Sequence, residues 1–223
     1  MHRALASHAA ADEVVGRLAH DVRTPLLTAR SAVSLVREQL GELAPDLEAL
    51  VGRAEAALDR VDRTLTAAVE HARVGTTPLA PRRVEVRGVL LEAIASVGAD
   101  AEARTVVSGQ DRSALADPDA LRRIVTNLVD NALRYGGDGT VQVTIGGGGA
   151  VVTIEVHDDG PGLGGDDDLF APFVRGATSN GRDGSGLGLA TAADLARRLG
   201  GHLSGRDVPE GGAVLTLELP AAT

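Results

Sequence analysis

The chain has 223 residues, of which 43% are hydrophobic, which suffices for one large domain or two small domains with packed cores. It contains no cysteine, which excludes disulfides, thiolate nucleophiles and cysteine-ligated zinc. All 22 basic residues are arginine, so Walker-A phosphate loops and Schiff-base chemistry, which need a lysine amine, are excluded as well. The net charge of −9 argues against a nucleic-acid partner.

No apolar run approaches the roughly 18 residues that a membrane span requires. We therefore expect no membrane contact within this chain and a cytoplasmic location for it, whether or not the native protein is longer and membrane-anchored.

A helix, a turn and a second helix are predicted over residues 9–74. Apolar residues recur at alternating steps of mainly three and four along 15–40 and 47–72, which defines a heptad seam on each helix. A lone hairpin buries two such seams poorly. We therefore expect a homodimer through residues 9–74 that forms a four-helix bundle, with packing of the seams on the rest of the chain as the alternative.

The sequence predicts a multidomain protein. Residues 1–74 form the helical hairpin, 75–83 read as a linker because they hold two prolines and no periodicity, and 84–223 predict an α+β sandwich. Helices are expected over 89–103, from an Asp117 N-cap and Pro118 onward, and up to Leu199; strands are expected at 140–145, 151–156, 202–206 and 213–219, with the four glycines 146–149 as a hairpin turn.

His20 lies on the outer side of the first predicted helix, at heptad position f when Val15 is position a. Asp21 adjoins it and Thr24 follows one turn later on the same face. Pro25 interrupts the heptad pattern at a cost of roughly 3 kcal/mol, which predicts a kinked helix, or else a helix that ends at Thr24. A surface histidine usually has no function, but one beside a bend and a carboxylate suits a nucleophile.

Asn127 and Asn131 lie four residues apart on an otherwise apolar predicted helix, followed by Arg134 and Tyr135. Asparagine is a poor residue for a helix interior, so the pair is either a surface accident or a functional feature. As ligands, the amide oxygens could coordinate Mg²⁺ beside phosphates, with Arg134 supplying positive charge.

Two glycine-containing segments follow. Asp158 ends a strand and precedes Gly160 and Gly162, which indicates either a tight turn or a carboxylate placed to accept from an amine. Residues 184–189 read Gly-Ser-Gly-Leu-Gly-Leu before a helix, a lead-in that lets backbone N–H groups approach phosphates. The three aromatic residues of the chain, Tyr135, Phe170 and Phe173, all fall within or between these motifs, which suits a base-stacking surface and a hinged lid.

Together these motifs resemble the core of a bacterial sensor histidine kinase of two-component signalling, over about residues 10–220. Five segments carry the resemblance in the family's order: 20–26 resembles the H box, 127–132 the N box, 158–162 the first glycine box, 169–173 the F box and 184–189 the second glycine box. Since no sensor segment precedes His20, and such a core normally follows an input domain, we expect an excised part of a longer protein, with a signal that arrives through another subunit as the alternative.

The resemblance implies a dimerisation and phosphotransfer domain followed by an ATP-binding domain of the gyrase/Hsp90/MutL type, with ATP and Mg²⁺ as cofactors. It implies that His20 is phosphorylated, that Asp21 orients its ring, and that Asp158 binds the adenine amine. It also implies that Thr24 serves dephosphorylation of a regulator, that Asn131 binds Mg²⁺, and that the nucleotide is lined by Asn127, Arg134 and Tyr135. The implied residues of the glycine boxes are Gly160, Gly162, Gly184, Gly186, Leu187 and Gly188. Residues 163–183 would form a lid, with Phe173 and Arg175 near its hinge.

The implied activity is autophosphorylation of His20 by ATP, followed by transfer to an aspartate of a response-regulator receiver domain. Asp21 and Thr24 also fit a phosphatase activity toward that regulator. The alternatives are a protein that acts mainly as a regulator phosphatase, an inactive dimeric scaffold that retains ATP binding, and a serine kinase or chaperone-like ATPase on the same ATP fold, which leaves the H box unexplained.

Overall fold

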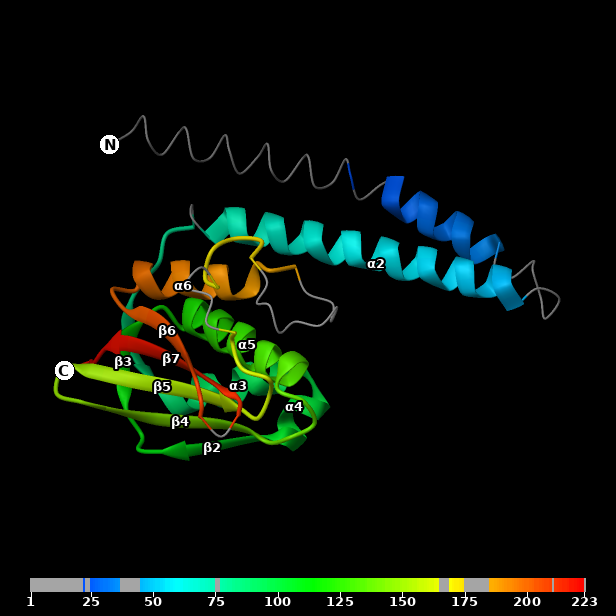
Figure 1. Ribbon diagram of the computed structural model, residues 1–223. Helices are drawn as coiled ribbons and strands as arrows, with labels where there is room; N and C mark the ends of the chain where they lie inside the picture. The colour runs from blue at the N-terminus through cyan, green and yellow to red at the C-terminus, as the bar shows by residue number, and fades with distance from the viewer. Residues whose placement is uncertain are drawn as a thin grey trace, which may run out of the picture. The chain divides into compact units, whose positions relative to one another are not determined.

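The computed structural model in Figure 1 describes residues 22, 25–36, 45–74, 77–164, 169–174, 185–209 and 211–222. The chain divides into a helical unit that ends at Thr76 and an α/β unit that starts at Thr77.

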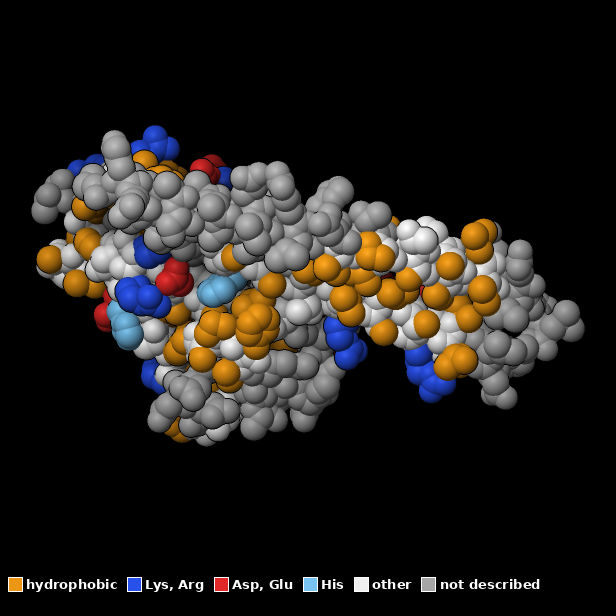
Figure 2. Space-filling model, turned by 90° about the horizontal axis from the view of Figure 1, so that it is seen from above, with side chains coloured by type: hydrophobic (Ala, Val, Ile, Leu, Met, Phe, Trp, Pro, Cys, Tyr) orange, Lys and Arg blue, Asp and Glu red, His pale blue; other side chains and the backbone are white. Residues whose placement is uncertain are grey.

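The helical unit contains a helix at 25–36 and the long helix α2 (Pro45–Val74). An ion pair of 3.1 Å between Arg30 and Asp59 joins the two helices. Val51 is buried, but Val61 of the same seam is 46% exposed, so the hairpin alone leaves its heptad seam incompletely covered. Figure 2 shows apolar side chains gathered along this hairpin. The four-helix bundle stays a prediction.

The α/β unit is built on a five-stranded mixed sheet. Its strands, in spatial order, are β2 (Thr105–Gly109), β4 (Val141–Gly148), β5 (Val151–Asp158), β7 (Ala213–Pro220) and β6 (His202–Asp207). β2 and β4 pair in parallel and the other neighbours are antiparallel. A smaller antiparallel pair is formed by β1 (Arg82–Glu85) and β3 (Ser113–Ala116).

Helices cover one face of the large sheet (Figure 1). They are α3 (Val86–Val97), α4 (Ala99–Arg104), α5 (Pro118–Tyr135) and α6 (Gly188–Arg198). α5 presents an apolar stripe that includes the fully buried Leu121, Ile124 and Leu128 to the sheet, as its amphipathic sequence dictates. This unit is the two-layer α/β sandwich that the sequence predicts.

The alternation of β5 sets the register of the core. Side chains of successive strand residues point to opposite faces, so Val152, Ile154 and Val156 face the helices and are buried. Asp158 is the next position on the same face. The strand therefore carries a carboxylate into a position that an apolar residue would normally occupy.

Three sequence-based expectations for elements need correction. The helix expected at 89–103 is two helices separated by Gly98, whose φ of 131° breaks the helical path. Gly146, Gly147 and Gly148 belong to β4, paired with 151–153, and the turn lies at 149–150. Strands β1, β2 and β3 were not expected, because segments of four or five residues give little alternation to read.

Asp117 is the N-cap of α5, as predicted from the Asp-Pro pair. Its carboxylate accepts hydrogen bonds from the N–H groups of Asp119 (3.0 Å) and Ala120 (3.1 Å), and from that of Ala80 (2.9 Å) in the segment before β1. Burial raises the pKa of Asp117, but the three N–H donors and the nearby Arg82 outweigh burial, so the net pKa is lowered. One side chain thus fixes the start of α5 and the entry to the unit.

We expect Asp117→Ala to lower the free energy of unfolding by about 1–2 kcal/mol at pH 7, since it removes an N-cap. Because the folded pKa lies below the ordinary value of 3.8, the stabilisation is complete above that value and is lost as the pH falls through the folded pKa. The cost of the substitution should therefore shrink in acid. Denaturant melts across pH measure it. Asp119→Asn, in the same turn and 81% exposed, is the control, and an equal effect in the two variants would contradict the assignment.

Candidate functional site

On the α/β unit, the predicted site residues Asp158 and Gly160 meet the end of α5 at one edge of the sheet, where β5 ends. Asp158 pairs there with Ala213, the first residue of β7. The same edge receives the end of α5 because the chain turns from that helix into β4, the other neighbour of β5.

Asp158 is the buried carboxylate of this edge, with 6% of its surface exposed. Burial raises the pKa of the carboxyl group, while the hydrogen bond from the Gly160 N–H to Oδ1 (2.9 Å) and the charge of His157 oppose that shift only in part. The position of Asp158 at the end of the strand and the hydrogen bond from its own turn hold the carboxylate in one orientation. It can therefore serve as a fixed hydrogen-bond acceptor.

The two asparagines lie on α5 at the margin of its buried stripe, and both are half-buried. Asn127 meets the start of α6: a Cβ atom placed on Gly188 would lie 3.7 Å from the Asn127 Oδ1. The structure thus brings the first asparagine and the second glycine motif together. Asn131 follows one turn further along α5, toward the end where Tyr135 lies.

The end of α5 contacts the turn after β5. A Cβ atom on Gly160 would lie 2.5 Å from the carbonyl oxygen of Tyr135, so only glycine permits this approach of the two backbones. Arg134 forms an ion pair with Asp130 on the same helix, at 2.8 Å from Nε to Oδ2. The guanidinium is 43% exposed, so it stands at the surface of the site.

Phe173 and Gly186 meet although twelve residues separate them. The Phe173 N–H donates to the Gly186 carbonyl oxygen at 3.0 Å, and both residues have positive φ angles, 65° and 69°. A positive φ is uncommon for a residue with a Cβ atom, so the tertiary contact holds Phe173 in this conformation. Its ring is 63% exposed. Leu187, between the two glycines, is buried and anchors the start of α6.

Five predicted site residues lie outside the described part of the chain. They are His20, Asp21 and Thr24 of the first motif, and Arg175 and Gly184 of the later loop.

The structure adds residues that the motifs did not indicate. The Asp207 carboxylate, at the end of β6, accepts a hydrogen bond from the Leu163 N–H (2.5 Å) and lies against Gly162. Gly212 passes so close to the Asp158 carbonyl group that a Cβ atom would lie 2.0 Å from its oxygen. The Gly211-Gly212 pair is the signal in the sequence that could have indicated the close approach of Gly212 to Asp158. In the structure both glycines have positive φ angles.

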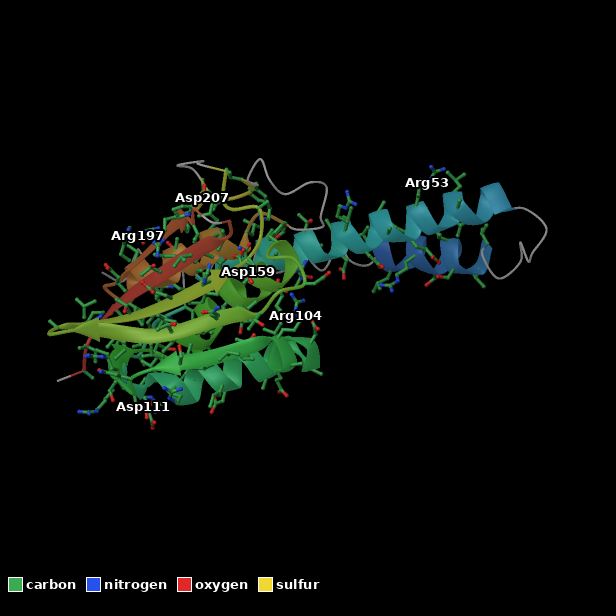
Figure 3. All side chains as sticks on the ribbon, turned by 60° about the horizontal axis from the view of Figure 1, so that its bottom comes forward. Arg53, Arg104, Asp111, Asp159, Arg197 and Asp207 are labelled. Carbon is green, nitrogen blue, oxygen red and sulfur yellow. The ribbon has the colours of Figure 1, made fainter. Side chains whose placement is uncertain are left out.

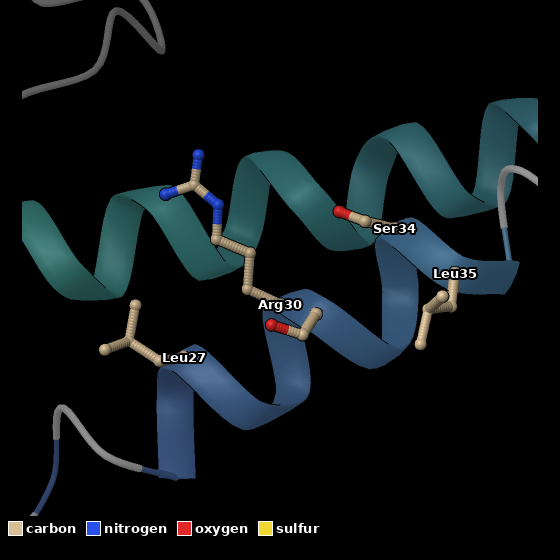
Figure 4. Close-up of a pocket in the computed structure, with 5 residues that line it drawn as sticks. Leu27, Arg30, Ser34 and Leu35 are labelled. Atoms are coloured by element: carbon tan, nitrogen blue, oxygen red, sulfur yellow. The ribbon is translucent and has the colours of Figure 1, made fainter.

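A shallow groove on the helical unit is separate from these residues. It is lined by Leu27, Arg30, Ser31, Ser34 and Leu35 of the helix at 25–36 (Figure 4). Leu27 and Leu35 are more than half exposed, and Arg30 is held by Asp59 of α2. The polar residues that line the groove, Arg30, Ser31 and Ser34, belong to none of the predicted motifs, so the groove is not part of the candidate site.

Comparison with known proteins agrees with this geometry. The family described as histidine kinase-, DNA gyrase B- and HSP90-like ATPase matches residues 116–223. A sensor histidine kinase component, HK1, of Mycobacterium tuberculosis is 40% identical over 137 residues, which cover 59% of this chain and 79% of that protein. The chain belongs to the sensor histidine kinase family.

Two further relatives extend the match over the whole kinase core. The sensor protein KdpD of M. tuberculosis is 33% identical over 229 residues, covering 96% of this chain but only 27% of KdpD. The crystal structure of full-length ShkA in complex with AMPPNP superposes with a TM-score of 0.68 and 27% identity, over 95% of this chain and 46% of ShkA. The chain therefore spans about a quarter of KdpD. Among the described residues, no helix is long and apolar enough to cross a membrane.

The raised pKa of Asp158 has a consequence for the stability of the folded chain. The folded protein holds this proton to higher pH than the unfolded chain, so stability falls as pH rises from the ordinary value of 3.8 to the folded pKa. Asp158→Asn removes that loss and keeps an oxygen for the Gly160 N–H. We expect the free energy of unfolding of the variant, relative to wild type, to rise with pH across this window. Paired melts measure it, with Glu92→Gln at an exposed position of α3 as control, and a flat difference for Asp158→Asn would contradict the account.

Proposed function

We propose that this chain binds ATP at the Asp158 edge and autophosphorylates His20, from which the phosphoryl group passes to an aspartate of a response-regulator receiver domain. The observation that carries the proposal is the buried Asp158 carboxylate at the end of β5, in a turn that packs against the end of α5, the helix that bears both asparagines. A carboxylate in this position is suited to accept from the exocyclic amine of adenine.

The residues present fit a nucleotide. Gly160 brings backbone against the Asp158 carboxylate and Gly212 brings backbone against the Asp158 carbonyl group, where side chains would collide. α6 begins at Gly188 with no side chain capping its first N–H groups, and a helix N-terminus favours phosphate. This N-terminus lies beside Asn127. The site needs no lysine, which agrees with a chain that has none.

Asn131 is the residue that would hold Mg²⁺ through its amide oxygen, an oxygen ligand of the kind that this ion prefers. A bound Mg²⁺ neutralises charge on the phosphates during phosphoryl transfer. Arg134 would add positive charge near them, and Tyr135 would contribute an aromatic surface beside the nucleotide.

In the proposed reaction a ring nitrogen of His20 attacks the γ-phosphorus of ATP. A bond between that nitrogen and phosphorus forms, the bond from phosphorus to the β,γ-bridging oxygen breaks, and ADP leaves. Asp21 would accept a hydrogen bond from the other ring nitrogen and so fix the tautomer. Asp21 and Thr24 also suit the reverse task of orienting water to dephosphorylate the regulator, so we propose a phosphatase activity as a second function.

The half-covered heptad seam supports a homodimer. Val61, Val22 and Val36 of the two seams remain more than 40% exposed in a single chain. A second hairpin would bury such positions in a four-helix bundle. We therefore place the homodimer interface on residues 9–74.

Incubation with radiolabelled ATP and Mg²⁺ tests the proposal. We expect label that is labile in acid and stable in alkali, as a phosphoramidate is, and we expect His20→Gln to abolish it. His202→Gln, an exposed histidine on β6, should keep wild-type labelling. Label that survives in His20→Gln would contradict the assigned acceptor, and ATP binding without any label would favour a phosphatase or a scaffold.

A second prediction concerns the metal. Asn131→Ala should raise the Mg²⁺ concentration for half-maximal labelling by about tenfold or more, because a ligand is lost. Nucleotide binding measured in EDTA should stay within about twofold of wild type, since the adenine contacts are intact. Gln142→Ala, which removes an exposed amide on β4, is the matched control. An unchanged Mg²⁺ requirement in Asn131→Ala would remove Asn131 from the metal site.

A further inference from the structure

The loop at 136–140 connects α5 to β4 and forms one wall of the Asp158 edge. A Cβ atom on Gly136 would lie 2.6 Å from the Asp158 Cβ, and one on Gly139 would lie 2.7 Å from the Asp159 Oδ2. The turn at 158–160 is therefore packed directly against this loop. A displacement of the loop would change the position of the Asp158 carboxylate.

The glycines of this loop make it costly in backbone entropy to hold in one conformation. Three of its five residues are glycine, and Gly137 has a φ of 74°. Such residues lose more backbone entropy on ordering than any others and bring no side chain to pack. Some other group has to hold the loop in place.

That group is Arg104, the last residue of α4. Its Nη2 donates to the carbonyl oxygens of Gly137 (2.5 Å) and Gly139 (3.0 Å), and its Nε donates to Gly139 (3.3 Å). Its Nη1 pairs with Asp100 at 3.3 Å, and the side chain is 22% exposed. A guanidinium offers five N–H donors in a fixed plane, so one side chain can hold two carbonyl groups at once.

The sheet register explains why Arg104 reaches this loop. Thr105 opens β2 and pairs with Val141, which opens β4, so the residues that precede the two strands are neighbours. β5 runs antiparallel to β4, which brings the end of β5 to the same edge. Arg104 before β2, the loop before β4 and Asp158 at the end of β5 therefore lie at the same end of three adjacent strands. Figure 3 shows Arg104 and Asp159 at one end of the sheet and Asp111 at the other.

We propose that Arg104 is a positioning residue for adenine recognition: by holding the carbonyl groups of Gly137 and Gly139, it fixes the loop against which the turn at 158–160 is packed. Arg104 acts through the loop and the turn. This inference rests on the proposed function, in which Asp158 accepts from the adenine amine.

Arg87 provides a matched control at the opposite end of β2. Its Nη2 donates to the carbonyl oxygen of Gly109 (2.8 Å), its Nε pairs with Asp111, and its side chain is 28% exposed. Arg87 thus makes the same kinds of bond as Arg104, and the two side chains are buried to a similar extent. The bonds of Arg87, however, are not made beside a predicted site residue. The two arginines differ mainly in which end of the sheet they hold.

The test measures binding of ATP and of inosine triphosphate, which lacks the exocyclic amine, to the full chain with Mg²⁺. We expect Arg104→Met to weaken ATP binding by about tenfold or more, as displacement of a recognition group does, and to narrow the preference for ATP over the inosine nucleotide. Arg87→Met should lower the denaturation midpoint to a comparable extent yet keep affinity and preference within about twofold. Arg104→Lys should recover part of the loss, because its ammonium can still donate to a carbonyl.

The outcomes separate this inference from its premise. Wild-type ATP affinity and preference in Arg104→Met, alongside a loss in Asp158→Asn, would overturn the role of Arg104 and leave the proposed function standing. A proportional loss for both nucleotides would also overturn it, since that result indicates stability alone. A wild-type chain that fails to bind ATP, or an Asp158→Asn variant that binds it normally, would overturn the proposed function and this inference together.

Discussion

The candidate site of the α/β unit is organised around one buried carboxylate at the end of a central strand. β5 alternates so that Val156 and Asp158 share the face that packs against the helices. Removing a carboxylate from water is unfavourable unless hydrogen bonds compensate, and the raised pKa of Asp158 shows that compensation is partial. The fold therefore retains a position that lowers its own stability, which is the usual cost of a binding group held ready for a ligand.

Glycine backbone forms much of the surroundings of Asp158, where it packs closely around the buried aspartate. Gly136, Gly160 and Gly212 each approach the aspartate so closely that a Cβ atom would lie less than 3 Å from one of its atoms. Tight backbone packing of this kind needs glycine, and glycine in turn needs outside support because it adds conformational freedom to the unfolded chain. The support comes from side chains on other elements, Arg104 before β2 and Asp207 at the end of β6.

Whether a feature could be predicted from the sequence depends on how far apart along the chain the interacting residues lie. The Asp117 cap, the amphipathic α5 and the position of Asp158 at a strand end depend on residues within one turn or one strand, and these predictions agree with the structure. The contacts of Arg104 and Asp207 join residues 33 to 44 positions apart, so no local pattern indicates them. The glycines of β4 were misread as a turn because their strand character comes from pairing with 151–153.

The all-arginine composition connects these observations. Three arginines, Arg87, Arg104 and Arg198, each donate to a backbone carbonyl oxygen in or next to a loop or strand end, at Gly109, Gly137 and Thr77. A planar guanidinium can bind a carbonyl oxygen and a carboxylate at the same time, as Arg87 and Arg104 do, whereas a lysine ammonium acts as a flexible point charge. Of these three arginines, Arg104 lies at the Asp158 edge, where it serves the backbone, while Arg134 at the surface of the same site pairs with Asp130. In the proposed function the negative charge of a nucleotide would be met by Arg134, by the N–H groups at the uncapped start of α6, and by a metal ion held through an asparagine amide oxygen of α5.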